Sequence, residues 1–537
     1  MLGERRPRAT AANTDAAGAD DRTVGVPRDA VTQPDIAGTD ASRAVAAAPG
    51  SAWRDPVTWV IASLVFCAYF TLSLYRLLQL NPASYDLGIY TEYVKQLSQL
   101  HAPIVDILGP GFNLFGNHFQ VGVAVLAPFF HLFPSAGTLL FFQALAVAVS
   151  VFPVTAAGTA LAGRTSGRLI GFGYGFCWGL QQMVNSDFHE IALAVPLLAF
   201  SLSALVRRRP AAAICWAMPL VFIEEDQGFT VAAIGLFLVL SALWPRLAPG
   251  RAGPEGHHYT ALWGGVFLVG WGVFWTVFAI AVFIPHFNPA HQYYFWKDGG
   301  VVGGGGGGSL SPVSLAVQLG GGWSVKLRTV VLLLLPTAFA ALGSPVALIA
   351  LPGLGLRFVS TNTAYWGTAW QYNATIMPVL FIAAAQAVGR WQRLRDSSAA
   401  PAWYAVRRGI GRHGPAMMAA VAVALAFQFP LNNLWQSSTY RLDAHVAAAD
   451  AAIAVVPDGA TVQTTLDLLA PLAARTDTFW IGTAGNPLTQ YVVFDNDDSG
   501  YSPPVNDVPA FIANMYPHDG YVQVFALDGV YVFRRGT

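Results

Sequence analysis

The sequence predicts an all-α polytopic membrane protein of about eleven transmembrane helices, followed by a small C-terminal α/β domain. Of its 537 residues, 54% are hydrophobic and only 11% are charged, less than half of the roughly 25% charged residues usual in soluble domains. Apolar runs of the roughly 20 residues that span a bilayer recur through the middle of the chain. They begin at Val57, Thr138, Leu169, Ile191, Ala211, Phe229, Ala261, Val330, Tyr372 and Ala416, and a shorter one covers Pro345 to Leu356. Residues 431–537, in contrast, are polar and mixed. These observations exclude a disordered chain and an ordinary cytosolic enzyme.

The overall charge and the cysteines exclude further classes. Lys and Arg together number 30, as do Asp and Glu, so no bulk charge attracts nucleic acid and we expect no nucleic-acid partner. The three cysteines, Cys67, Cys177 and Cys215, lie in apolar runs. They have the spacing of neither a disulfide framework nor a metal site.

Residues 1–54 are rich in Ala, Asp, Arg, Thr and Pro and contain almost no large apolar side chains. This composition cannot bury a core, so it predicts a disordered tail. It is not a signal peptide, because no apolar stretch follows Arg5 and Arg6 promptly. Arginines on the N-terminal side of the first apolar run place the tail in the cytoplasm.

Residues 55–430 form the predicted membrane domain. Its basic loops, such as Arg207–Arg209 and Arg390–Arg412, face the cytoplasm under the positive-inside rule. The acidic residues cluster in the loops on the opposite, predicted outer side. The apolar segment 119–133 is too short to span, and a span there would turn the later arginine loops outward. We therefore expect it to lie along the outer surface or to be re-entrant. The first outer loop, 81–136, then holds two juxtamembrane helices, 86–100 and 118–133.

Residues 431–537 form the predicted extracytoplasmic α/β domain. Strands are expected at 460–464 and 490–494, with a helix at 466–475 between them. A hairpin is expected from strands 521–525 and 530–534, because Asp528 and Gly529 between them are a strong hairpin turn signal.

Four clusters of polar residues converge on the predicted outer face. They are 84–90, 115–119, 187–190 and 224–226. Each alone is typical of a helix cap or a solvated loop acid. Together, on a face with few lysines, they favour a functional site, since ionisable groups at a membrane boundary are costly. The candidate residues in these clusters are Tyr85, Asp86, His118, Asp187, His189, Glu190, Glu225 and Asp226.

Three cations are candidates for binding phosphate: Lys326, Arg328 and Arg357. Such groups suit a phosphate or pyrophosphate headgroup, and the alternative is ordinary snorkelling at the interface. His118, His189 and the acids could also hold a divalent metal. Their spacing matches no tight metal motif, so we expect no cofactor and no metal ligands.

Several ordered motifs resemble a known family. They are Tyr85-Asp86-Leu87-Gly88-Ile89-Tyr90, Phe115-Gly116-Asn117-His118-Phe119, Leu126-Ala127-Pro128, Asp187-Phe188-His189-Glu190, Glu225-Asp226 and Val456-Pro457-Asp458-Gly459-Ala460. Together they resemble the bacterial membrane family called domain of unknown function 2079, over roughly residues 69–494. Two positions depart from its pattern: Glu190 follows His189 with no proline between, and Glu224 stands where lysine is commoner.

This family is similar to the GT-C glycosyltransferases, which use polyprenyl-phosphate-linked sugars at the outer face. The resemblance implies that activity, with an Asp just after the first span as catalytic base. Asp86 occupies this position, with His118, Glu225 and Asp226 as further catalytic residues. Tyr85, Asp187, His189, Glu190, Lys326, Arg328 and Arg357 would bind substrate.

The leading hypothesis is therefore an inverting glycosyltransferase of the cell membrane. Its partners would be the lipid bilayer, a polyprenyl-phosphate sugar donor, and a glycan or protein acceptor of the cell envelope. One alternative is a transporter or flippase that uses the acids as a proton or cation path. Against it, the acids cluster at the outer face and no inverted repeat is visible. Another alternative is a non-catalytic envelope scaffold.

Overall fold

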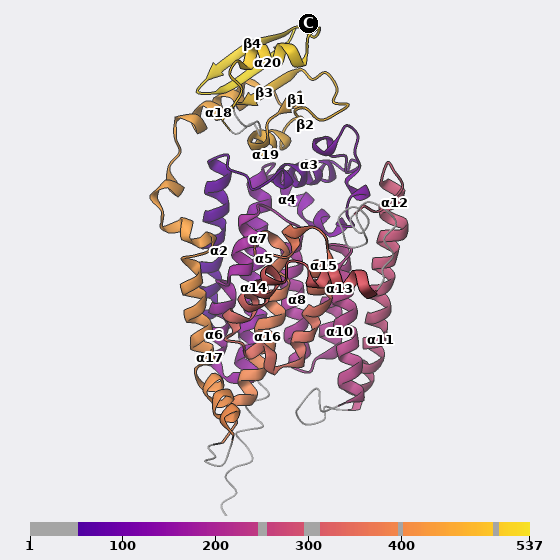
Figure 1. The fold of residues 1–537 in the computed structure, drawn as a ribbon, viewed down its shortest axis with the longest axis vertical. Helices are drawn as coiled ribbons and strands as arrows, with labels where there is room; N and C mark the ends of the chain where they lie inside the picture. Colours follow the sequence, from indigo (N-terminus) through magenta and orange to yellow (C-terminus); the bar gives the residue numbers. More distant parts are fainter. Residues whose placement is uncertain (1–51, 245–254, 295–311, 396–400, 498–503, 537) are drawn as a thin grey trace, which may run out of the picture. The chain divides into compact units, whose positions relative to one another are not determined.

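The computed structural model describes residues 52–244, 255–294, 312–395, 401–497 and 504–536. Residues 1–51 of the expected tail lie outside this described part. Most of the described chain is helical, and long helices run side by side in a bundle (Figure 1). The bundle helices are α2 (Pro56–Leu78), α5 (Ala136–Ala162), α6 (Arg164–Gly175), α7 (Trp178–Asn185), α8 (Ile191–Val206), α9 (Pro210–Ala217), α10 (Gln227–Leu243), α11 (Glu255–Phe278), α12 (Ile284–Phe287), α13 (Pro312–Gly320), α14 (Trp323–Leu334), α15 (Leu351–Val359), α16 (Ile376–Trp391) and α17 (Ala402–Ala426).

Four helices of the described residues are long and apolar enough to cross a membrane: Pro56–Leu78, Ala136–Ala162, His258–Phe287 and Gln371–Trp391. Others are shorter, including Ile191–Val206, Gln227–Leu243 and Pro345–Val359. One expected span, beginning at Leu169, is divided into α6 and α7 because the backbone is extended at Cys177. Breaks of this kind could not be predicted from apolar run length, and the count of eleven spans stays a prediction.

Small residues allow the bundle helices to approach closely. A side chain on Gly235 of α10 would come within 2.7 Å of the carbonyl oxygen of Gly265 on α11. Close backbone approach through small residues is how helices associate in lipid, where no hydrophobic force drives them together. The α10–α11 pair therefore depends on glycine at this crossing.

Residues 81–136, the predicted first outer loop, contain α3 (Asp86–Ser98) and α4 (Ala127–Leu132). The helix expected at 86–100 is confirmed by α3. The helix expected at 118–133 is present as one apolar helical run, Val121–Leu132. It begins three residues later than expected, and its first part, Val121–Leu126, is 3₁₀ and continues into α4. Gly122 allows this segment to approach residue 222 closely, since a Cβ there would lie 2.8 Å from the carbonyl oxygen of Phe222.

The C-terminal region forms a five-stranded sheet in the order β2-β1-β3-β5-β4. Its strands are β1 (Thr461–Thr464), β2 (Asp477–Trp480), β3 (Tyr491–Asp495), β4 (Tyr521–Leu527) and β5 (Val530–Arg535). β1 is parallel to β2 and β3, whereas β5 is antiparallel to β3 and β4. The predicted strands β1, β3, β4 and β5 are confirmed, including the turn at Asp528 and Gly529. Strand β2 was not predicted.

Three helices accompany the sheet: α18 (Ala444–Val455), α19 (Leu469–Ala473) and α20 (Val508–Met515). Leu469 and Ala473 of α19 share a buried cluster with Leu87 and Val94 of α3. Lys95 of α3 donates to the carbonyl oxygen of Thr476 at 2.5 Å. The C-terminal region therefore packs directly on the helix that Asp86 begins.

Candidate active site

Asp86 is the first residue of α3, but its carboxylate does not cap the helix. Tyr85 occupies the N-cap position and its side chain makes no capping hydrogen bond, while the Ser84 hydroxyl accepts from the Asp86 amide at 3.2 Å. Instead, Oδ2 of Asp86 accepts a hydrogen bond from the Ser84 hydroxyl at 2.6 Å and lies 3.3 Å from Nε2 of His189. Oδ1 makes no hydrogen bond within the described residues, and the side chain is 31% exposed. One oxygen is therefore held in place, while the other is open to a ligand.

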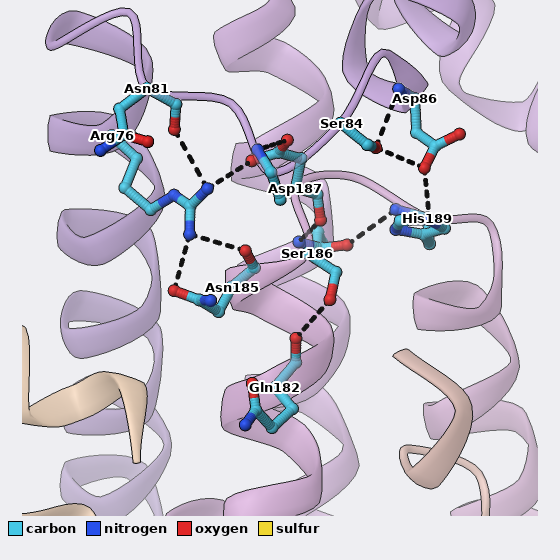
Figure 2. A network of polar contacts seen from close by, with 11 residues as sticks. Arg76, Asn81, Ser84, Asp86, Gln182, Asn185, Ser186, Asp187 and His189 are labelled. Carbon is cyan, nitrogen blue, oxygen red and sulfur yellow. Dashed lines mark hydrogen bonds and ion pairs between the residues drawn. The ribbon is translucent and has the colours of Figure 1, made fainter. Parts of the chain in front are cut away.

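The loop that carries His189 is held by a buried polar network (Figure 2). Asp187 has a φ of 66°, which is unusual for a residue with a side chain. Gln143, buried within α5, donates to the Asp187 carbonyl at 2.8 Å and accepts from the His189 amide at 3.1 Å. Oδ2 of Asp187 accepts from the Ala83 amide at 2.6 Å. This loop is thereby tied to the segment that leads into Asp86.

Arg76, at the end of α2, joins the same network. Its Nη1 donates to the carbonyl and the side-chain oxygen of Asn185, both at 2.7 Å. Its Nη2 donates to the Asn81 carbonyl at 3.0 Å and lies 3.4 Å from Asp187. The guanidinium therefore connects the first span to both loops of the candidate site.

Asp86 and His189 shift each other's pKa. Burial alone would raise the pKa of Asp86, but the hydrogen bond and charge of His189 outweigh it, and the pKa lies below its ordinary value. Burial alone would lower the pKa of His189, but Asp86 and neighbouring acids raise it. Asp86 is therefore ionised at neutral pH, as a general base must be.

His118 and Glu225 form a second pair. Nδ1 of His118 lies 2.8 Å from Oε1 of Glu225, and Oε2 accepts from the Phe119 amide at 3.0 Å. The Tyr293 hydroxyl also donates to Oε1 at 2.8 Å. Burial opposes ionisation of both groups, but their mutual attraction raises the pKa of His118 and lowers that of Glu225.

Further acids surround these pairs. Glu190 is buried and hydrogen-bonded to the Tyr90 hydroxyl. Burial and neighbouring carboxylates raise the pKa of Glu224 well above its ordinary value, and they raise that of Asp226 to about 6. In the part of the chain that the structure describes, no three His, Cys, Asp or Glu side chains are arranged to hold a metal ion.

The three candidate cations differ in what they contact. Arg357 donates to the backbone carbonyls of Tyr365, Gly367 and Tyr372 and to the side chain of Asn373. Lys326 donates to the Gln318 carbonyl at 2.5 Å and lies 4.1 Å from the Trp366 ring centre. Arg328 lines a cavity and makes no hydrogen bond to any described residue. Of the three, Arg328 is the one whose donors remain available.

The structure thus brings Asp86 together with His189 and Asp187, and His118 together with Glu225. Tyr85 lies at the edge, with its ring centre 5.3 Å from that of Trp480. Sequence reasoning missed Arg76, Gln143, Tyr293 and Trp480. A glutamine in the middle of an apolar helix was a usable signal for Gln143. The others depend on contacts between distant segments.

The fold combines a helical bundle, in which several helices are long and apolar enough to cross a membrane, with a small C-terminal sheet. Residues 76–504 match the family described as predicted membrane protein, DUF2079, and the chain belongs to this family. A search of curated proteins found no match. Among solved structures, the fold is similar to the crystal structure of ArnT from Cupriavidus metallidurans bound to undecaprenyl phosphate. That likeness has a TM-score of 0.51 at 13% identity and covers 90% of this chain and 98% of ArnT.

Proposed function

We propose that this chain is an integral-membrane glycosyltransferase that moves a sugar from a polyprenyl-phosphate donor to a cell-envelope acceptor at the outer face. The observation that carries the proposal is the Asp86 carboxylate, with Oδ2 fixed by Ser84 and His189 and Oδ1 open. The fold likeness to ArnT, whose crystal structure contains undecaprenyl phosphate, supports a lipid-phosphate carrier as the partner.

In the proposed reaction, Oδ1 of Asp86 takes the proton from an acceptor hydroxyl. The hydroxyl oxygen forms a bond to the anomeric carbon of the donor sugar, and the bond from that carbon to the lipid phosphate breaks. Attack opposite the leaving group inverts the anomeric configuration. A well-placed base contributes roughly 10²–10⁴-fold to such a step.

His189 would position Asp86 and keep it ionised through their hydrogen bond. The His118–Glu225 pair and Asp226 would supply charged and hydrogen-bonding groups around the reacting atoms. Tyr85, Asp187 and Glu190 would contact substrate. Lys326, Arg328 and Arg357 remain the proposed substrate-binding cations. Arg328 is the one whose guanidinium makes no hydrogen bond within the described chain, so it is available to an anionic group of a substrate.

The proposed topology has about eleven spans and a cytoplasmic N-terminus. The first outer loop, 81–136, and the region 431–537 would face outward. The packing of α19 on α3 supports part of this scheme, because two segments in direct contact lie on the same side of a membrane. Residues 55–430 would form the membrane domain.

The decisive experiment uses the purified full chain in lipid nanodiscs with a radiolabelled polyprenyl-phosphate sugar. Sugar transferred to a cell-envelope acceptor, or released to water, would be measured for the wild type and for Asp86→Asn. Transfer by the wild type and its loss in the variant are expected. No sugar transferred or released, with donors of several sugar types, would refute the proposal.

A further inference from the structure

Two adjoining cavities lie beside the candidate active site. The first, of about 430 Å³, lies between the end of α2 and residues 433–446. The second, of about 590 Å³, lies between α7, α14 and residues 428–433. Asn433 lines both. Each volume is within the range of known small-molecule sites. The two cavities, which share Asn433 as a lining residue, are together called the amide groove here.

The amide groove is lined by primary amides. Those whose side chains make no hydrogen bond within the described residues are Asn81, Gln182, Gln428, Asn432, Asn433 and Gln436. Each amide offers two donors and an acceptor, which suits the hydroxyl groups of a sugar. The apolar lining residues are Leu72 and Val446 in the first cavity and Val331, Leu332, Phe429 and Pro430 in the second, and polar residues outnumber them in both. This lining favours a polyhydroxylated ligand over a lipid chain.

The groove also carries an excess of positive charge. Arg441 lines the first cavity and Arg328 the second, and neither guanidinium has a partner among the described residues. Asp443 is the acid of the first cavity, and its carboxylate caps α18 by accepting from the Val446 amide at 3.1 Å. Guanidinium groups bind carboxylate and phosphate in a two-pronged geometry. The ligand should therefore carry anionic groups.

The first cavity shares residues with the polar network around Asp86. Arg76 lines the first cavity. It donates to Asn185, which lines the second cavity. It also lies 3.4 Å from Asp187 of the candidate site. Asn81 lines the first cavity, and Asp86 follows it by five residues in the chain. Even a fully extended segment of that length spans at most about 17 Å. A chain of a few sugars in the groove could thus place a hydroxyl at Asp86.

We propose that the amide groove binds the acceptor, and that the acceptor is a glycan chain bearing anionic groups. The role of this glycan as acceptor rests on the proposed glycosyltransferase function, but its binding to the groove can be measured without turnover. The amides bind sugar hydroxyls, and the two arginines, Arg441 in the first cavity and Arg328 in the second, bind the anionic substituents.

The test is calorimetric binding to the full chain in nanodiscs, with no donor present. Tetragalacturonate is the probe, maltotetraose is its uncharged counterpart of equal length, and inorganic tripolyphosphate is an anion without sugar. Tetragalacturonate should bind most tightly. Arg328→Gln and Arg441→Gln should each weaken it at least about tenfold, as expected for a charge-assisted hydrogen bond. Arg395→Gln, an exposed arginine outside both cavities, is the matched control and should bind as the wild type does.

Unchanged tetragalacturonate binding in both groove variants would overturn the proposal. Equal binding of tripolyphosphate and tetragalacturonate would also overturn it, because the groove would then recognise charge alone. Sugar release to water, measured separately, distinguishes the two proposals. If release is present but glycan binding fails, the acceptor groove is wrong. If glycan binding holds but neither release nor transfer is detected, the glycosyltransferase is wrong.

Discussion

Replacing Asp86 by Asn separates a catalytic base from a structural carboxylate. An Asn side chain has nearly the same shape, and its oxygen can still accept from Ser84 and His189. The variant keeps both contacts but exchanges a charge-assisted hydrogen bond for a neutral one, so stability should fall by only about 1 kcal/mol. It cannot take up a proton. Turnover should therefore fall by about 10²–10⁴-fold, which corresponds to about 2.7–5.4 kcal/mol of activation free energy.

The assay is the initial rate of sugar transfer at saturating donor, with donor binding and thermal unfolding measured on the same preparation. Asp106→Asn is the matched control. Asp106 also begins a helical turn of the first outer loop, but its carboxylate accepts from the Gly111 amide at 2.7 Å, away from His189. The control should keep wild-type turnover. Near wild-type turnover in folded Asp86→Asn, with donor bound normally, would refute the assignment of Asp86 as the base.

Three further predictions concern pairing, pH and topology. Glu225→Gln and His118→Gln should each lower turnover about tenfold, and the double variant should lose little more, because the two groups act as one pair; additive losses would contradict this. Burial raises the pKa of Glu92 to about 8 despite the nearby charge of Lys95. Its ordinary value is about 4.3, so the folded state holds a proton that the unfolded state releases between these values. Glu92 therefore makes the free energy of unfolding fall as pH rises through this window. The melting temperature of Glu92→Gln minus that of the wild type should increase from pH 5 to pH 9. If this difference stayed constant over that range, the pKa of Glu92 would not be the cause of the pH dependence. With Cys67, Cys177 and Cys215 replaced by Ser, an impermeant thiol reagent should label Asp519→Cys but not Thr165→Cys in intact cells; the reverse pattern would invert the proposed topology.

Local signals predicted the elements that depend on neighbouring residues. The helix expected at 86–100 begins at Asp86, as α3. The Asp528–Gly529 turn predicted the β4–β5 hairpin. These succeed because a few adjacent residues determine the backbone conformation.

Features that depend on distant segments could not be predicted. The division of one expected span into α6 and α7 places an extended residue inside an apolar run, and no proline or charge marks it. The pairing of His118 with Glu225 joins two loops 107 residues apart. The motifs indicated that both residues belong to a site, but only the fold shows that they bond each other and that Asp86 bonds His189 instead.

The packing of the C-terminal region on α3 has a consequence for how the protein is made. Lys95 bonds a carbonyl 381 residues further along the chain, which a ribosome adding about 5–20 residues per second reaches roughly 20–75 s later. In the proposed topology, residues 81–136 cross the membrane during that interval without their covering partner, and Leu87 and Val94 lack the contact that α19 later provides. Extracytoplasmic chaperones would meet the loop in this state, and a prematurely terminated chain would expose it permanently to quality-control proteases.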